Sequence, residues 1–195
     1  MKTHLYSLVI ILFSLTLLSC SDSNTRVNVS GKGSENFSNL DLKTDNSGLS
    51  TAFATIKTIH GDIVFRFYAK KAPVTSKRIL QLIQNGFYNG LTFHRVIPNF
   101  IIQTGDPTGT GTGGSGVKIP LESNDIQHIK GTIAIARSLD INSGDSQFYI
   151  SLTTSPHLDG KYTVFGQVIE GLEILPKISK GDKILSIDLD LNAKN

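Results

Sequence analysis

Eight short β-like runs, separated by turns rich in glycine or proline, follow residue 51 and limit this chain to a mainly β fold. The first two, residues 52–59 and 63–68, alternate apolar and polar side chains around His60-Gly61-Asp62 and predict a β-hairpin. The other six are residues 92–97, 101–103, 132–136, 147–151, 164–169 and 184–189. Many short strands joined by turns are typical of a closed or nearly closed barrel. We therefore predict one β domain over residues 51–195.

Two helices are expected within this domain. Pro73 suits the first turn of a helix, Gly86 suits the position just after its end, and apolar residues between them form a stripe. A helix over residues 73–85 follows. A second helix is expected near residues 170–180, but Pro176 lacks the N–H that a continuing helix needs. We expect that helix to be short, kinked or restarted at Pro176.

The composition excludes several classes of protein. The chain has 195 residues, 39% of them hydrophobic, which is enough for one domain with a core. Nineteen Lys and Arg against sixteen Asp and Glu do not indicate a nucleic-acid surface. We also expect the protein to be a monomer. No histidine has a metal-binding spacing, so no metal is predicted. Residues 109–116 contain G-x-G-x-x-G but no helical pattern follows, so we interpret them as a loop at a pocket edge and expect no cofactor.

The N-terminus has the layout of a signal peptide. Lys2 precedes an uncharged apolar run over residues 5–18, which ends at Ser19 and at Cys20, the only cysteine. Residues 17–20 resemble a bacterial lipobox, so residues 1–19 are predicted to be removed and Cys20 to be lipidated. A permanent membrane helix and an ordinary buried cysteine are the alternatives, although the apolar run is shorter than the roughly twenty residues that span a bilayer.

Residues 20–50 are rich in Ser, Asn, Asp, Thr and Gly and have no apolar period, so they predict a flexible tether after the lipid anchor. The domain would then be extracytoplasmic and attached to a membrane. Ser21, in place of the aspartate that retains many enterobacterial lipoproteins in the inner membrane, favours the outer membrane.

The segment Phe93–Asp106 places polar side chains among apolar ones. Arg95 and Gln103 share the parity of a strand that Pro98-Asn99 interrupts, and this break can bring Arg95, Phe100 and Gln103 into one shallow pocket. The segment contains no nucleophile. It therefore predicts a site that binds rather than one that cleaves.

This segment, with residues 131–137 (GTIAIAR) and 146–150 (SQFYI), resembles the cyclophilins, a family of peptidyl-prolyl cis-trans isomerases. The similarity extends from about Ala52 to about Leu189. The resemblance implies a mainly β, eight-stranded antiparallel β-barrel closed by two helices. It also implies prolyl isomerase activity without a cofactor, with proline-containing polypeptides as partners.

Arg95 matches the catalytic arginine of the family within Phe93-His94-Arg95. Rotation of a prolyl bond destroys amide conjugation, so the nitrogen regains a lone pair that a fixed donor can stabilise in the transition state. Arg95 supplies such a donor, and the alternative is a surface arginine paired with a carboxylate. Isomerisation needs no proton transfer, so His94 is expected to pack against or position Arg95.

Further residues match the substrate groove of the family. The predicted substrate-binding residues are Phe100, Ile101, Gln103, Ala136, Arg137, Ser138, Gln147, Tyr149, His157, Leu158 and Tyr162. Phe100 and Ile101 could instead be barrel core. Tyr149 stands where phenylalanine is usual, Tyr162 where many eukaryotic members have histidine, and His157 where an aromatic residue, Trp or Phe, is usual. His157 could also be an ordinary loop histidine.

These residues lead to one main hypothesis and two rivals. The main hypothesis is a lipid-anchored isomerase that accelerates X-Pro rotation in exported proteins and so helps them fold. A membrane-tethered proline-peptide-binding module with little turnover, or a structural surface lipoprotein, would be the alternatives. Because the chain has no tryptophan and carries His157, weak binding of cyclosporin is also predicted.

Overall fold

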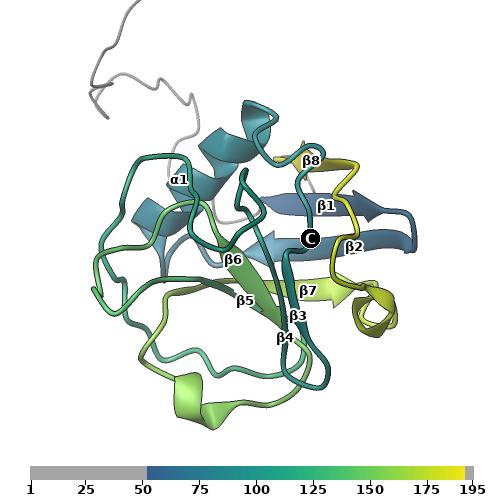
Figure 1. Cartoon of the computed structure of the whole chain (residues 1–195). Coiled ribbons are helices and arrows are strands. Elements are labelled where there is room, and N and C mark those ends of the chain that lie inside the picture. Colours follow the sequence, from purple (N-terminus) through teal and green to yellow (C-terminus); the bar gives the residue numbers. More distant parts are fainter. Residues whose placement is uncertain (1–51, 192–195) are drawn as a thin grey trace, which may run out of the picture. The chain divides into compact units, whose positions relative to one another are not determined.

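The computed structural model describes residues 52–191. They contain one antiparallel β-sheet of eight strands (Figure 1). The predicted signal peptide, the predicted lipidation at Cys20 and the predicted tether lie outside the described residues. The strands are β1 Phe53–Thr58, β2 Gly61–Phe67, β3 Arg95–Ile97, β4 Ile101–Thr104, β5 Thr132–Ile135, β6 Phe148–Ser151, β7 Val164–Glu170 and β8 Ser186–Asp190. The predicted mainly β, eight-stranded antiparallel fold is confirmed.

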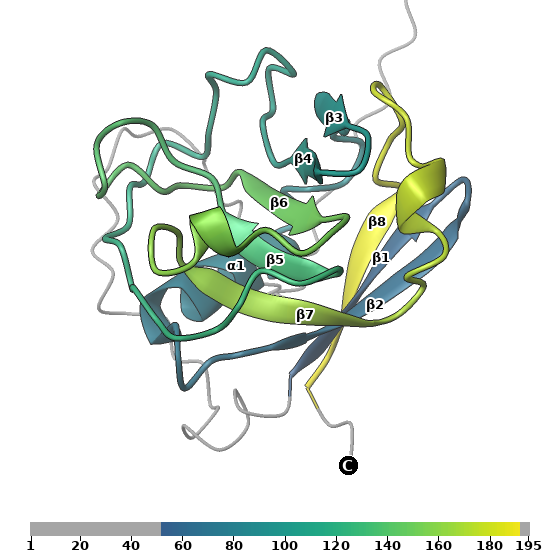
Figure 2. The same cartoon turned by 90° about the horizontal axis from the view of Figure 1, so that it is seen from below.

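The strand order is β3-β4-β6-β5-β7-β2-β1-β8, and the sheet curls into a half-barrel (Figure 2). The chain before β3 is joined to the chain before β8 by backbone hydrogen bonds. Phe93 N–H donates to the Asp182 carbonyl (2.8 Å), and Ile184 N–H donates to the Leu91 carbonyl (2.8 Å). These bonds connect the two ends of the curled sheet beside β3.

The one α-helix of the described residues, α1, spans Pro73–Gln84 and agrees with the predicted helix. Pro73 begins it, and Gly86 follows its end with a left-handed backbone angle of φ 66°. In place of the expected second helix there is a three-residue 3₁₀ turn, η3 (Leu175–Lys177), with Pro176 at its centre. The proline thus leaves only the shortest helical form. Across residues 52–191, no helix combines the length and apolar character needed to cross a bilayer.

Both faces of strands β5 and β6 are buried, and each face packs in a different hydrophobic cluster. Ile133, Phe148 and Ile150 point into the main hydrophobic core. Ala134 and Tyr149, one position out of phase, point to the opposite face and join a second cluster. This second cluster supports the functional site.

Candidate active site

A cavity of about 490 Å³ lies beside the hairpin formed by β3 and β4. Nine of its lining residues were predicted from the sequence, namely Arg95, Phe100, Ile101, Gln103, Ala136, Arg137, Tyr149, Leu158 and Tyr162. Four others had not been predicted to contact substrate, namely His94, Thr110, Gly111 and Lys180. Three predicted substrate-binding residues, Ser138, Gln147 and His157, do not line the cavity. The structure therefore gathers most of the predicted residues from five separate segments.

The β3–β4 hairpin brings Arg95 and Gln103 together. Phe100 N–H donates to the Ile97 carbonyl (3.1 Å), and Asn99 has φ 59°, which with Pro98 before it matches a type II turn. This turn reverses the chain so that Arg95 and Gln103 become cross-strand partners. The Arg95 side chain is solvent-exposed, and its Nη1 donates to Gln103 Oε1 (3.0 Å). The Pro-Asn break in the sequence is thus what brings the cation and the carboxamide to one face.

Gln147 lies behind Gln103 and orients it. Gln103 Nε2 donates to Gln147 Oε1 (2.8 Å), while Gln147 Nε2 donates to the carbonyls of Gly111 (3.0 Å) and Gly113 (2.7 Å). The amide of Gln103 is therefore fixed with its oxygen toward Arg95. The sequence suggested that Gln147 contacts substrate. In the structure it does not line the cavity and instead links the hairpin to the glycine-rich loop.

Asp106 shapes that glycine-rich loop, which contributes Thr110 and Gly111 to the cavity. Its carboxylate is buried and accepts hydrogen bonds from the Thr108 hydroxyl (2.8 Å) and N–H (2.7 Å), and from the N–H groups of Gly111 (2.5 Å) and Gly113 (3.2 Å). Burial alone raises the pKa of Asp106, but these four donors outweigh it and lower the pKa to about 2. The predicted interpretation of residues 109–116 as a loop at the pocket edge is consistent with this placement.

The apolar side of the cavity is also the second hydrophobic cluster. Ile101 and Tyr149 are buried members of that cluster, and Phe100, Leu158 and Tyr162 pack against it. The rings of Tyr149 and Tyr162 meet edge to face, with centroids 5.7 Å apart. The sequence left pocket wall and barrel core as alternatives for Phe100 and Ile101. In the structure the two residues belong to both, since they line the cavity and pack in the second hydrophobic cluster.

The Tyr149 hydroxyl is bonded to a histidine behind the cavity wall. Tyr149 Oη lies 2.9 Å from Nε2 of His128, a residue with no exposed surface, and His128 Nδ1 lies 2.8 Å from Asp159 Oδ1. The same carboxylate oxygen accepts the His128 backbone N–H (2.7 Å), and these hydrogen bonds lower the pKa of Asp159. The hydroxyl that phenylalanine would lack thus fixes the wall to the loop after Leu158. Sequence reasoning missed His128.

Removing this hydroxyl should destabilise the protein. In Tyr149→Phe, the buried Nε2 of His128 loses its hydrogen-bond partner, so the free energy of unfolding should fall by about 1–3 kcal/mol. Urea unfolding measures the change. Tyr162→Phe removes the same atom from a half-buried ring on the same wall. Equal stability changes in the two variants would show that the His128 contact contributes nothing.

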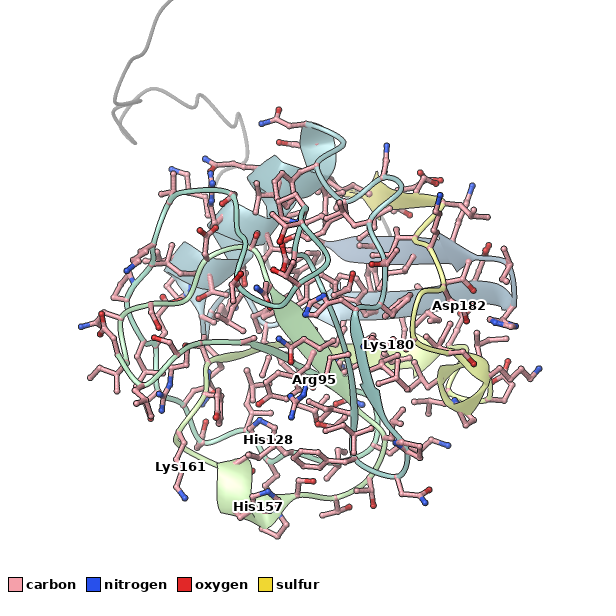
Figure 3. The ribbon with its side chains drawn as sticks, in the orientation of Figure 1. Arg95, His128, His157, Lys161, Lys180 and Asp182 are labelled. Carbon is pink, nitrogen blue, oxygen red and sulfur yellow. The ribbon has the colours of Figure 1, made fainter. Side chains whose placement is uncertain are left out.

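His157 and Ser138 lie at the margins of the site. His157 is exposed and is labelled in Figure 3. Its ring stacks on Phe100, with centroids 5.8 Å apart and planes 20° apart, so it supports the wall from outside. Ser138 Oγ donates to Ser143 Oγ (2.8 Å) in an exposed loop. Neither residue lines the cavity.

His94 precedes Arg95 in the chain and is a buried residue of the cavity lining. The residue is only 7% exposed, and neither ring nitrogen has a hydrogen-bond partner among residues 52–191. Burial lowers the pKa of His94, partly offset by the nearby Asp106 carboxylate, and this favours the neutral ring. Within the same part of the chain, no group of three His, Cys, Asp or Glu residues is placed to hold a metal ion.

Residues 53–189 match the family of cyclophilin type peptidyl-prolyl cis-trans isomerases. The chain therefore belongs to the cyclophilin family and is a peptidyl-prolyl cis-trans isomerase.

The match extends over almost the whole length of each of the following relatives. A peptidyl-prolyl cis-trans isomerase from Synechococcus elongatus is 46% identical over 142 residues, which are 72% of this chain and 97% of the relative. The crystal structure of a cyclophilin type isomerase from Cryptosporidium parvum is similar with a TM-score of 0.67 and 31% identity, covering 72% of this chain and 98% of that one. A second structure of the Cryptosporidium protein, determined in the presence of the dipeptide Ala-Pro, has a TM-score of 0.63 with 31% identity and covers 73% and 99%.

Proposed function

We propose that the cavity binds proline-containing segments of polypeptides and that Arg95 is the catalytic residue. The observation that carries this proposal is the Arg95–Gln103 pair, which stands at the edge of an apolar wall made by Phe100, Ile101 and Tyr149. A proline ring can pack on that wall while its peptide backbone meets the polar pair. The related Cryptosporidium structure, determined in the presence of the dipeptide Ala-Pro, supports a ligand of this kind.

The proposed chemistry requires no covalent intermediate. The barrier to rotation of the peptide bond is roughly 18–20 kcal/mol because rotation removes amide conjugation. In the twisted state the prolyl nitrogen becomes a hydrogen-bond acceptor, which it is not in either planar state. A guanidinium donor from Arg95 would therefore stabilise the transition state more than the cis or the trans form, which is the condition for catalysis.

Gln103 has a positioning part in this proposal. Its Oε1 accepts from Arg95 Nη1, and its Nε2 is held by Gln147. The guanidinium therefore keeps one orientation before the peptide arrives, so less ordering is needed when the transition state forms. We also propose that the protein acts as a monomer, since the residues of a single chain are sufficient to form the cavity.

A pair of matched peptides tests the proposed binding and turnover. Cis-trans interconversion of an X-Pro tetrapeptide should speed up when the purified protein is added, and the same peptide with Ala in place of Pro should bind much more weakly. Tight binding of the proline peptide without acceleration would favour the alternative of a binding module with little turnover.

Cyclosporin should bind weakly. The family-typical aromatic side chain at position 157 is replaced by a histidine that stacks on Phe100 outside the cavity. Titration of the protein with cyclosporin during the isomerisation assay measures the affinity. Nanomolar inhibition would contradict the prediction, whereas a His157→Trp variant should bind the drug more tightly than the wild type.

We also propose that the enzyme acts on exported proteins from a lipid anchor on Cys20, as a folding helper. The support is the order of features in the sequence: an apolar run, a lipobox-like Leu17-Leu18-Ser19-Cys20 and a polar tether. Two or more acyl chains give lasting attachment. In Cys20→Ser the protein should leave the membrane fraction. Unchanged fractionation would contradict the lipid anchor, and accelerated refolding of an exported, proline-limited client would support the folding role.

A further inference from the structure

The lining of the cavity is positively charged. It contains Arg95, Arg137 and Lys180 but no aspartate or glutamate. The fourth basic residue, His94, is buried, and burial favours its uncharged form by lowering its pKa. A cavity with three cations and no anion in its wall attracts negative charge, and the low-dielectric apolar wall beside them strengthens that field.

The three cations come from three separate parts of the chain, and the fold brings them to one cavity. Arg95 begins β3, Arg137 follows β5, and Lys180 lies between η3 and β8. Figure 3 labels Arg95 and Lys180, which face the same cavity from neighbouring segments. The backbone hydrogen bond from Gly181 N–H to the Phe93 carbonyl (3.0 Å) holds the segment of Lys180 against the segment that leads into Arg95.

Hydrogen bonds inside the protein occupy the three cations unequally. Arg137 donates from Nε and Nη2 to the Lys161 carbonyl (3.1 and 2.9 Å) and from Nη1 to the Ser138 carbonyl (2.9 Å). Arg95 donates to Gln103, and the proposed reaction needs its remaining donors. Among residues 52–191, Lys180 has neither a hydrogen bond nor an ion pair and is exposed. Lys180 is therefore the cation whose donors are available to a ligand.

Three carboxylates that lie close to cavity residues along the chain have partners elsewhere. Asp106 accepts four hydrogen bonds from its own loop. Asp159 is bonded to His128. Asp182, two residues after Lys180, accepts from the Ser179 N–H (2.7 Å) and contacts His60 Nε2 (2.8 Å). None of these carboxylates pairs with a cavity cation.

We infer that this enzyme prefers X-Pro bonds with an acidic residue adjacent to the proline, and that Lys180 contacts the substrate carboxylate. This inference rests on the proposed function of the cavity. Lys180 is thus a specificity-determining residue, while Arg95 remains the residue that acts on the prolyl bond.

Peptides that differ in one charge test the inference. Two sets carry Glu, Gln or Lys, one set immediately before the proline and the other immediately after it, and protease-free exchange spectroscopy gives kcat/KM for each. In at least one set the Glu peptide should exceed the Gln peptide by about three- to five-fold at low ionic strength, the range of a partly exposed charge pair, with the Lys peptide lowest. High salt should reduce the ratio.

Two lysine variants locate the effect. In Lys180→Gln the ratio of Glu to Gln peptides should fall close to one. In Lys177→Gln, which removes an exposed charge on η3 that does not line the cavity, the ratio should stay as in the wild type. Equal kcat/KM for Glu and Gln peptides in both sets, or a ratio that survives in Lys180→Gln, would overturn the inference. Failure to accelerate any peptide would instead overturn the proposed function of the cavity.

Discussion

Replacing Arg95 with alanine is expected to lower kcat/KM for a proline peptide by about 100- to 1,000-fold, the loss typical of removing one preorganised transition-state donor. The Arg95 side chain is exposed, and the one hydrogen bond it makes in the described structure is to Gln103, so its loss should leave the fold intact. Most of the effect should fall on kcat, because the donor acts on the twisted nitrogen rather than on the planar peptide.

Two further variants separate the mechanism from a general charge effect. Arg95→Lys keeps the charge but loses the planar, multi-donor guanidinium, so its activity should lie between those of the wild type and Arg95→Ala. Arg66→Ala removes an exposed arginine of β2 that does not line the cavity, and its kinetics should match the wild type. A loss of less than a few-fold in Arg95→Ala would remove Arg95 from the mechanism.

Asp106→Asn is expected to destabilise the protein by about 2 kcal/mol at pH 7, which corresponds to the fall in the pKa of Asp106 to about 2 from its ordinary value. Four donors that favour the charged carboxylate would then face a neutral amide. The glycine-rich loop they hold accepts the hydrogen bonds of Gln147, so kcat/KM should fall as well.

The pH dependence of this effect has a definite sign. Because the folded-state pKa of Asp106 is depressed, its ionisation stabilises the fold fully above about pH 4, and this contribution is lost as the pH falls toward 2. Urea unfolding at several pH values should therefore show the wild type converging on Asp106→Asn in acid. Asp140→Asn, in an exposed loop, is the control. A stability difference that is independent of pH would contradict the role of the Asp106 charge.

The local sequence was sufficient to predict the strands, helix α1 and the Arg95–Gln103 side of the site. Alternation marks β1 and β2, and a Pro-Asn turn brings two nearby residues together across one hairpin. Such features depend on contacts over a few residues, where steric and hydrogen-bonding rules act directly. The resemblance to cyclophilins supplied the rest of the apolar wall, including Leu158 and Tyr162.

Residues joined over long separations in the chain could not be predicted in this way. His128 precedes β5 and meets Tyr149 of β6 through a side-chain contact that the fold creates. Lys180 reaches the cavity because the chain before β8 bonds to the chain before β3. Gln147 was assigned to the substrate, whereas its amide turns toward Gln103 and the glycine-rich loop. No periodicity or spacing in the sequence predicts where these three side chains lie.

Exchange spectroscopy with substoichiometric wild-type and Arg95→Ala protein tests the central claim most directly, because it records binding and cis-trans interconversion of the same proline peptide. The wild type should bind the peptide and produce exchange between its two isomers. Arg95→Ala should bind it with similar affinity, through the apolar wall, and produce almost none. Exchange in Arg95→Ala at close to the wild-type rate would contradict the claim that Arg95 stabilises the twisted prolyl bond.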